Sequence, residues 1–239
     1  MDPYRIVVSE IMLQQTQTYR VEPKYLAFIK KFPNFRPLAK ASTAEVLSAW
    51  QGLGYNRRAL YLKKIAETVV KEYKGKLPSN SVELQKLSGI GPNTAGSIGA
   101  FAFNQPVVFI ETNIRRVFIH FFFPKKQQVD DRDILKLVAD TLDRKNSREW
   151  YFALMDYGAT LRQAQGKLLK GKFENPNRRS KHYAVQSKFE GSVRQTRGLI
   201  LKTLLDGPRS LAGLSPEIIA DLEREGFVQK VKNKWQLVV

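Results

Sequence analysis

Hydrophobic residues recur at the spacing of an amphipathic helix through most of this chain as far as Leu161. Residues 6–29 predict two helices with a break near residues 21–23, because proline disfavours helix in the residue before it. Further helices are predicted over 58–73, 131–142 and 149–161. Ser42 and residues 79–81 are predicted to cap the helices that follow them. This pattern predicts a mainly α protein.

The pattern changes after Leu161. Residues 166–194 are rich in Lys, Arg, Ser and Gln, which indicates either a basic connector lying on a surface or on DNA, or a solvated linker. Helical spacing returns over 198–205 and 216–226, and residues 228–237 alternate like a β-hairpin that turns at Lys232 and Asn233. We therefore predict three parts: a helical domain, a basic connector and a small winged-helix-like α+β module, over 1–165, 166–194 and 195–239.

The charge of the chain narrows the class of partner. The formal net charge is +18 and the pI is near 10.0, which favours a polyanion, most commonly nucleic acid. No apolar run approaches the ~20 residues that span a bilayer, and the N-terminus does not begin a signal peptide, so we expect no membrane association. The sequence has no cysteine, which excludes disulfides and favours the cytoplasm.

Residues 87–95 (LSGIGPNTA) form a glycine-cornered turn between two apolar helical runs. Gly89 and Gly91 allow a sharp bend and close approach to another molecule, and proline is suited to open the next helix. The amide groups at that helix start, at Asn93 and Thr94, are predicted to bind a DNA phosphate.

Two carboxylates stand in apolar surroundings. Glu10 lies within an apolar helix, where burial tends to raise the pKa of a carboxyl and suits a general acid; an exposed position on the solvent face is equally consistent with its spacing. Glu111 lies between Ile110 and Ile114, and taken alone it is better explained as a helix N-cap or first-turn acid. The presence of both acids beside a phosphate-binding turn favours chemistry on DNA.

A second glycine turn, residues 50–55 (WQGLGY), presents Tyr55. This ring could stack on or wedge between bases, with Arg57 and Arg58 reaching phosphates, but taken alone Tyr55 is better explained by ordinary packing. Gln14 and Gln15 are predicted to probe base edges in the minor groove. The two histidines, His120 and His182, lack metal-ligand spacing and are expected to be structural.

Four motifs together resemble one family. They are residues 9–17 (SEIMLQQTQ), 50–55 (WQGLGY), 87–95 (LSGIGPNTA) and 155–159 (MDYGA). In this order they are similar to the helix-hairpin-helix glycosylases related to endonuclease III, and most of all to the MutY-type adenine DNA glycosylases. The resemblance covers about residues 3–161. It implies a two-lobed helical fold with DNA crossing the cleft and the target nucleotide flipped into a pocket.

The resemblance also implies a role for each matching residue. Glu10 would protonate the purine, Glu111 would stabilise the positively charged sugar, and Asn113 would support it. Gln14, Gln15, Thr16 and Tyr55 match positions that fill or wedge the duplex, while Leu13 and Asp156 match the base pocket. The backbone carbonyls of Gln85, Leu87 and Ile90 match those that hold a monovalent cation.

The chain departs from the family in ways that change the expected chemistry. Glu111 stands where the family has Asp, and a misplacement of ~1 Å can cost ~100-fold in rate. Asn93 replaces the lysine of the bifunctional lyases and cannot form a Schiff base, which favours a glycosylase without AP-lyase activity. The family's cysteine quartet is absent, so we expect no cofactor and no iron–sulfur cluster. The C-terminal module is shorter than the domain that reads 8-oxoguanine.

We therefore expect a monofunctional DNA glycosylase of base excision repair that removes a flipped adenine mispaired with 8-oxoguanine or G. The alternatives are a thymine or uracil glycosylase acting on G mismatches, which the short C-terminal module favours, and a non-catalytic DNA-binding protein on the same scaffold. The expected partner is double-stranded DNA with a mismatched or damaged base. The protein is expected to be a monomer associated with the nucleoid in the cytoplasm.

Overall fold

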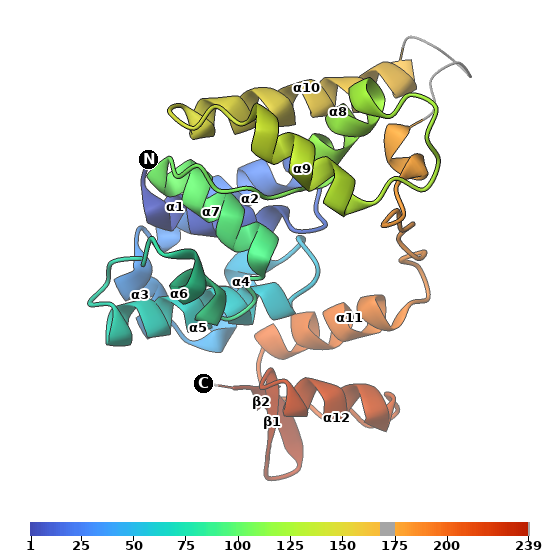
Figure 1. The fold of residues 1–239 in the computed structure, drawn as a ribbon. Coiled ribbons are helices and arrows are strands. Elements are labelled where there is room, and N and C mark those ends of the chain that lie inside the picture. Colours follow the sequence, from blue (N-terminus) through green and yellow to red (C-terminus); the bar gives the residue numbers. More distant parts are fainter. Residues whose placement is uncertain (168–174, 239) are drawn as a thin grey trace. The chain divides into compact units, whose positions relative to one another are not determined.

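The computed structural model describes residues 1–167 and 175–238, and it is mainly helical as predicted (Figure 1). The helices are α1 (Pro3–Leu13), α2 (Thr18–Lys31), α3 (Phe35–Lys40), α4 (Thr43–Trp50), α5 (Arg57–Glu72), α6 (Ser81–Lys86), α7 (Pro92–Phe103), α8 (Thr112–Phe122), α9 (Asp131–Thr141), α10 (Ser147–Lys167), the 3-10 helix η1 (Pro176–Arg179), α11 (Val193–Leu205) and α12 (Pro216–Arg224). Two strands follow, β1 (Val228–Val231) and β2 (Lys234–Leu237). Within the described ranges, no helix has both the length and the apolar character needed to cross a bilayer.

The chain folds into two compact units, each of which is described by itself. We call Tyr4–Pro78, Lys86–Gly89 and Ser187–Val239 the terminal unit, and Met1–Pro3, Ser79–Gln85 and Ile90–Gln186 the middle unit. The predicted connector, 166–194, lies partly outside the described residues, and the predicted domain boundaries stay a prediction.

The N-terminal helices of the terminal unit pack around buried aromatic rings. Phe28 from α2 and Trp50 from α4 are fully buried and meet edge to face, with their ring centroids 6.1 Å apart. Helix α4 begins as predicted: the Ser42 hydroxyl accepts a hydrogen bond from the Glu45 amide, and the Glu45 carboxylate accepts one from the Ser42 amide. Helix α5 packs against both α3 and α4.

The predicted break near residues 21–23 is wrong. Helix α2 runs through Pro23, and the chain breaks earlier, between Leu13 and Thr18. A proline inside a helix removes the hydrogen bond to the carbonyl four residues before it, here that of Tyr19. Both Tyr19 and Pro23 are exposed, so water can satisfy that carbonyl. The actual break falls where Gln15 adopts a left-handed backbone conformation, with φ of 52°.

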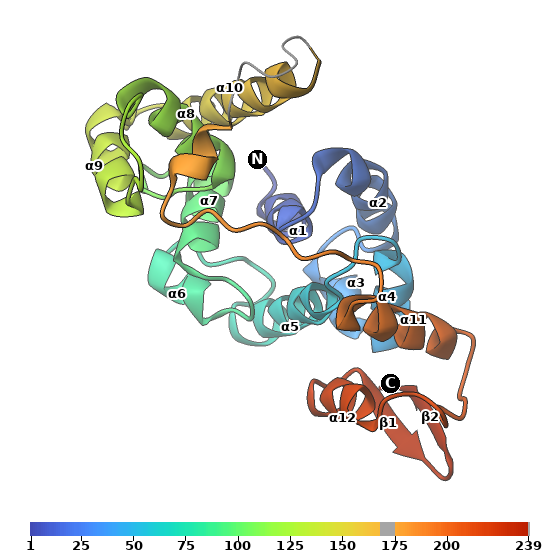
Figure 2. The same cartoon turned by 90° about the vertical axis from the view of Figure 1, so that its right-hand side faces the viewer.

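The middle unit is built on α8 and α10, which pack against each other (Figure 2). Its aromatic core joins Phe101 of α7, Phe109, and Tyr151 and Phe152 of α10. Phe101 and Phe152 stack with their ring planes only 3° apart. The short helix η1, which the sequence did not predict, lies against α8.

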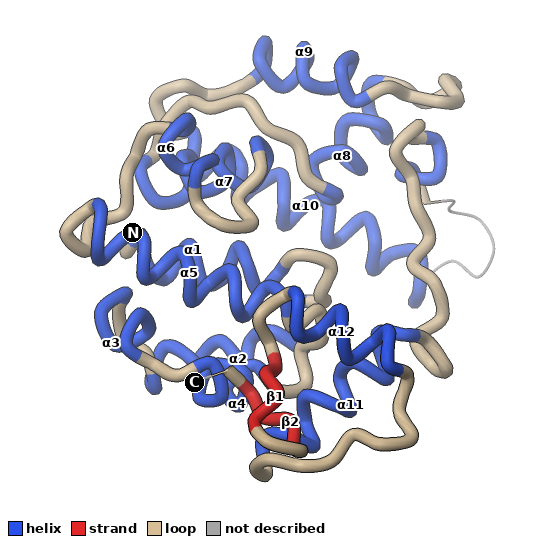
Figure 3. Tube along the Cα trace, turned by 90° about the horizontal axis from the view of Figure 1, so that it is seen from below, coloured by secondary structure: helices blue, strands red, loops and turns tan. Residues whose placement is uncertain are grey.

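The C-terminal module, which we define as residues 193–238, contains two helices and the predicted hairpin (Figure 3). Strands β1 and β2 are antiparallel, Val228 pairs with Leu237, and the turn falls at Lys232 and Asn233 as expected. Helix α11 contacts α4 and β2, so the module packs on the N-terminal helices of its own unit. This helix starts five residues before the predicted Gly198, because the Ser192 side chain caps it.

We expect Gly89→Ala to lower the free energy of unfolding by about 2–4 kcal/mol, because it adds both strain and overlap. Gly89 has φ of +74°, and a Cβ there would lie 2.3 Å from Cδ2 of Tyr61. Gly91→Ala is the matched control: its φ is −88° and no atom lies within 4 Å of the added Cβ. Urea denaturation should show a change below about 1 kcal/mol for this control. Equal effects of the two substitutions would contradict this interpretation of the turn.

Candidate functional site

The side chain of Arg58 joins two loops of the terminal unit. It leaves the first turn of α5 and is only 6% exposed. Its guanidinium donates to five oxygens: the carbonyls of Ile11 (3.0 Å), Met12 (2.8 Å), Gln14 and Gly54 (3.1 Å), and Thr16 Oγ1 (2.9 Å). One side chain thereby fixes the end of α1 and the segment after it to the glycine turn before α5.

This arrangement buries a positive charge. No carboxylate among the described residues bonds to Arg58; instead its guanidinium lies over the rings of Trp50 and Tyr55, 5.4 Å from each centroid. Withdrawal from water lowers the pKa of Arg58 to about 10, so the group stays charged at neutral pH. The prediction that Arg58 reaches DNA phosphates is wrong, because its side chain is buried and four of the five oxygens are backbone carbonyls.

The two loops present residues that the sequence predicted to touch DNA. Gln15 and Tyr55 both adopt left-handed backbone conformations, with φ of 52° and 49°. Such conformations cost about 1 kcal/mol or more in residues other than glycine, and they persist where surrounding contacts impose them. Gln15 is exposed, whereas Leu13, Gln14, Thr16 and Tyr55 are half-buried. Arg58 donates to the carbonyls of Gln14 and Gly54, the residues before these two, which stabilises the geometry, and the DNA contacts themselves stay a prediction.

Tyr55 and Arg57 have partners from the C-terminal module. The Tyr55 hydroxyl accepts a hydrogen bond from Arg194 Nη1 at 2.8 Å, and that guanidinium also lies over the ring. Arg57 forms a two-pronged ion pair with Glu225. The sequence had assigned Arg57 to DNA and had given these partners no role.

Glu10 lies on α1. Its side chain is half-buried, and is thus neither fully buried nor on the exposed face of the helix, which were the two alternatives that the sequence left open. Its neighbours Val7, Val8, Ile11 and Met12 are fully buried. The helix therefore turns an apolar face into the core of the terminal unit and carries Glu10 at the edge of that face.

Glu111 is the N-cap of α8 in the middle unit. Its Oε1 accepts hydrogen bonds from the backbone amides of Asn113 (2.6 Å) and Ile114 (2.8 Å). Among the described residues, no hydrogen bond reaches its Oε2. Burial raises the pKa of Glu111, against the lowering effect of the two amides and of Arg116 and Arg115. Glu111 can therefore cap α8 and still take part in chemistry, because Oε1 holds the helix amides and Oε2 is available to another group.

Asn113 is positioned by a buried cation that the sequence did not single out. Arg116 is 3% exposed, and its Nη1 donates to Asn113 Oδ1 and to the Gly158 carbonyl, each at 2.6 Å. A Cβ on Gly158 would lie 2.5 Å from the Asn113 carbonyl oxygen, so glycine is what lets α10 approach α8 here. The available signal was the glycine of the motif at residues 155–159. Asp156 of the same motif is exposed.

The helix η1 anchors both ends of α8. Asn177 is 4% exposed and donates from Nδ2 to the Thr112 carbonyl at 3.0 Å, at the first residue of α8. Arg179 donates to the carbonyls of Ile119 and Phe123 at the other end. This segment thereby fixes the helix that Glu111 caps.

The hairpin of residues 87–95 has the predicted geometry locally. Gly91 is the N-cap of α7 and Pro92 occupies its first turn. Gly91 and Asn93 are exposed and Thr94 is half-buried; Asn93 Oδ1 also accepts a long hydrogen bond, 3.5 Å, from the Ile110 amide. The amides of a first helical turn have no partner within the helix, which leaves them suited to bind an anion.

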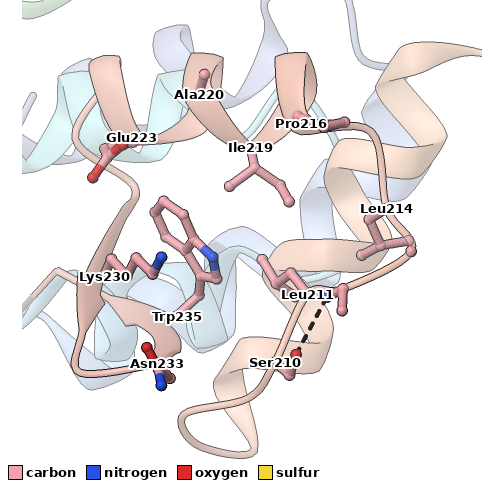
Figure 4. Close-up of a pocket in the computed structure, with 12 residues that line it drawn as sticks. Ser210, Leu211, Leu214, Pro216, Ile219, Ala220, Glu223, Lys230, Asn233 and Trp235 are labelled. Atoms are coloured by element: carbon pink, nitrogen blue, oxygen red, sulfur yellow. Dashed lines mark hydrogen bonds between the residues drawn. The ribbon is translucent and has the colours of Figure 1, made fainter.

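A groove of about 480 Å³ lies in the C-terminal module between α12 and the hairpin (Figure 4). Leu211, Ile219 and Trp235 form its apolar walls, and none of the predicted site residues lines it. Within 1–167 and 175–238, no three His, Cys, Asp or Glu side chains cluster as a metal site would require.

The predicted site residues are divided between the units. Glu10, Leu13, Gln14, Gln15, Thr16, Tyr55, Arg57, Leu87 and Gly89 belong to the terminal unit. Gln85, Ile90, Gly91, Asn93, Thr94, Glu111, Asn113 and Asp156 belong to the middle unit. That Glu10 and Glu111 act on one nucleotide stays a prediction.

A helical fold with a glycine-cornered hairpin and an acid capping a following helix is typical of helix-hairpin-helix DNA repair proteins. The chain belongs to the HhH-GPD superfamily of base excision DNA repair proteins, whose family pattern matches residues 8–140.

Curated relatives are named adenine DNA glycosylase. One from Buchnera aphidicola subsp. Baizongia pistaciae is 37% identical over 164 residues, which cover 67% of this chain and 46% of the relative. Another from Mycolicibacterium smegmatis is 38% identical over 159 residues, which cover 66% of this chain and 54% of the relative. The chain thus spans about half the length of these curated relatives.

Solved structures agree on the fold. A thermostable thymine-DNA glycosylase is 26% identical with a TM-score of 0.58, over 66% of this chain and 74% of that one. A trapped endonuclease III–DNA covalent intermediate is 18% identical with a TM-score of 0.61, over 72% of this chain and 80% of that one. The second likeness shows the fold alone.

We expect Arg58→Lys to lower the free energy of unfolding by about 2–4 kcal/mol, because a single ammonium cannot reach both loops and leaves buried carbonyls without donors. The neighbouring Arg57→Lys is the control, since Arg57 lies on the surface and such ion pairs contribute about 0–1 kcal/mol. Chemical denaturation measures both. A loss below 1 kcal/mol for Arg58→Lys would show that the two loops do not depend on this side chain.

Proposed function

We propose that the protein is a monofunctional DNA glycosylase that hydrolyses the N-glycosidic bond of a flipped adenine mispaired with 8-oxoguanine or G. The observation that carries this proposal is Glu111, a carboxyl with a raised pKa, one oxygen held by helix amides and the other open. Membership of a base excision repair family and the names of the curated relatives support it.

In this mechanism the bond between base and sugar breaks before water adds. Glu10 gives its proton to the purine ring, so that the bonding electrons leave with a neutral base. The sugar is left with a positive charge, which the Glu111 carboxylate stabilises electrostatically. A water molecule then bonds to the sugar carbon and gives up a proton, which returns to the carboxylate that Glu10 became in the first step. Asn113, oriented by Arg116, supports the carboxylate.

Two further features of the proposal follow from the hairpin. Asn93 has no amine, so the chain offers no Schiff-base nucleophile there, and we propose that AP-lyase activity is absent. We also propose a structural monovalent cation at the carbonyls of Gln85, Leu87 and Ile90. Carbonyl oxygens suit a hard cation, and the last carbonyls of α6 have no partner within the helix. The sequence offers no thiolate for an iron–sulfur cluster.

A thymine or uracil glycosylase acting on G mismatches is the second candidate. The likeness to a thymine-DNA glycosylase favours it. The half-buried carboxyl of Glu10 favours adenine, because pyrimidine removal has less use for an acid at that place.

A panel of labelled duplexes distinguishes these candidates. We expect alkali-labile strand breaks at A opposite 8-oxoguanine and at A opposite G, and none at T or U opposite G. Glu10→Gln should lower the single-turnover rate by about 100-fold or more, because it removes the proton donor. Breaks at T or U alone would support the second candidate. Binding without any break would indicate a non-catalytic DNA-binding protein.

The pH dependence of the single-turnover rate tests Glu111. The carboxylate must be ionised to stabilise the sugar cation, and its pKa is raised above the ordinary 4.5. The rate should therefore fall with decreasing pH, with a midpoint above 4.5. This fall is assigned to Glu111 and not to Glu10, because a proton donor is favoured by low pH.

Two substitutions at Glu111 complete this test. Glu111→Gln keeps an oxygen for the helix amides and should remove nearly all activity. Glu111→Asp keeps the charge and a good N-cap, but moves the carboxylate by ~1 Å, and should cost about 10–100-fold. An acid midpoint at or below pH 4.5 would contradict the role given to Glu111.

A further inference from the structure

Arginines from two distant parts of the chain gather beside Tyr55 within the terminal unit. Arg57 opens α5, whereas Arg194 and Arg197 lie in the first turns of α11. Arg194 donates to the Tyr55 hydroxyl, and both Arg57 and Arg197 bond to Glu225, the residue that follows α12. Residues separated by 139 and 168 positions thus form one cluster.

Glu225 is the carboxylate at the centre of this cluster. Arg57 donates to both of its oxygens, with Nε to Oε2 at 3.1 Å, and Arg197 Nη2 donates to Oε2 at 2.5 Å. The Glu225 side chain is 15% exposed, whereas that of Arg57 is 54% exposed. Burial tends to raise the pKa of Glu225, but the two arginines lower it, so the carboxylate stays ionised.

The cluster carries more positive charge than Glu225 can balance. Besides Arg57, Arg194 and Arg197, it includes Arg58 and also Arg20, which donates to the Gly52 carbonyl. Among the described residues, Glu225 is the one acidic side chain that bonds to any of these five. A guanidinium fork that binds a carboxylate with two parallel hydrogen bonds binds a phosphate in the same way.

We propose that Arg57, Arg194 and Arg197 form a binding site for DNA backbone phosphates beside Tyr55, and that Glu225 occupies this site in the free protein. The proposal rests on the proposed function, which brings a duplex to Tyr55. DNA phosphates compete with the carboxylate for Arg57 and Arg197. The C-terminal module therefore contributes to the DNA surface through α11, whereas α12 carries Glu217, Asp221 and Glu223 and would repel a phosphate.

The test compares two substitutions that change the charge equally. Glu225→Gln removes the carboxylate that competes with phosphate. Asp221→Asn removes a carboxylate of α12, the helix that Glu225 follows, and this carboxylate pairs with Arg224 instead. Affinity for a labelled undamaged duplex is measured by fluorescence anisotropy over a series of salt concentrations, because phosphate contacts set the salt dependence.

We expect Glu225→Gln to bind about 5–10-fold more tightly, with a salt dependence steeper by about one phosphate contact. Asp221→Asn should change affinity by less than about twofold, since it alters only the long-range field. In the double variant with Arg57→Ala, the gain from Glu225→Gln should fall by at least half. Equal gains from the two single substitutions, or weaker binding by Glu225→Gln, would overturn the proposal.

A second pair of variants decides the matter if Glu225→Gln disturbs folding. Arg197→Gln should weaken binding and reduce the salt slope by about one, whereas Arg224→Gln, which removes a cation from α12, should leave the slope unchanged. Equal effects of this pair would also overturn the proposal.

These binding results are independent of base excision. If the lesion panel shows no strand break but Glu225→Gln gains affinity as expected, the proposed enzymatic function fails and the phosphate site stands. If excision occurs but Glu225→Gln and Asp221→Asn behave alike, the phosphate site fails alone.

Discussion

A buried guanidinium without a carboxylate partner among the described residues holds the terminal unit's candidate DNA surface together. Arg58 donates from its two Nη atoms to carbonyl oxygens from the end of α1 and from the glycine turn before α5. These carbonyls lie at the end of a helix or in a loop, where the backbone offers them no donor. The hydrogen bonds from Arg58 therefore supply the donors that the carbonyls of both loops need. The left-handed conformations of Gln15 and Tyr55 persist because a charge in a low-dielectric site resists losing any of its partners.

In the middle unit, too, a buried arginine donates hydrogen bonds that hold neighbouring segments together. Arg116 is buried between α8 and α10, and its hydrogen bonds to Asn113 and to the Gly158 carbonyl fix the start of α8. Asn177 and Arg179 of η1 add hydrogen bonds at the two ends of that helix. Glu111 is therefore held by a helix that is itself held at both ends. A carboxylate fixed in this way needs little rearrangement to stabilise a developing positive charge, which is the condition for electrostatic catalysis.

The C-terminal module links the charge of the chain to its proposed chemistry. A net charge of +18 indicates a polyanionic partner, but it does not say which cations would meet that partner. In the structure, several arginines have internal roles: Arg58 and Arg116 are buried, and Arg115 pairs with Asp131. The arginines beside Tyr55 differ from these internal ones. A single carboxylate, Glu225, pairs with both Arg57 and Arg197, so positive charge remains in excess.

Helices, caps, the hairpin and the family motifs could be predicted from the sequence, because helical spacing, the Ser42 cap and the alternation of residues 228–237 depend on neighbours only a few positions apart. The roles of individual arginines could not. Arg57 and Arg58 are adjacent and chemically identical, yet one is exposed and the other buried, because α5 turns its side chains by about 100° per residue and the core lies on one side. The partners of Tyr55 and Arg57, and the Gly158 carbonyl that accepts from Arg116, come from 42 to 168 positions away, and only the packing of the folded chain brings them into contact.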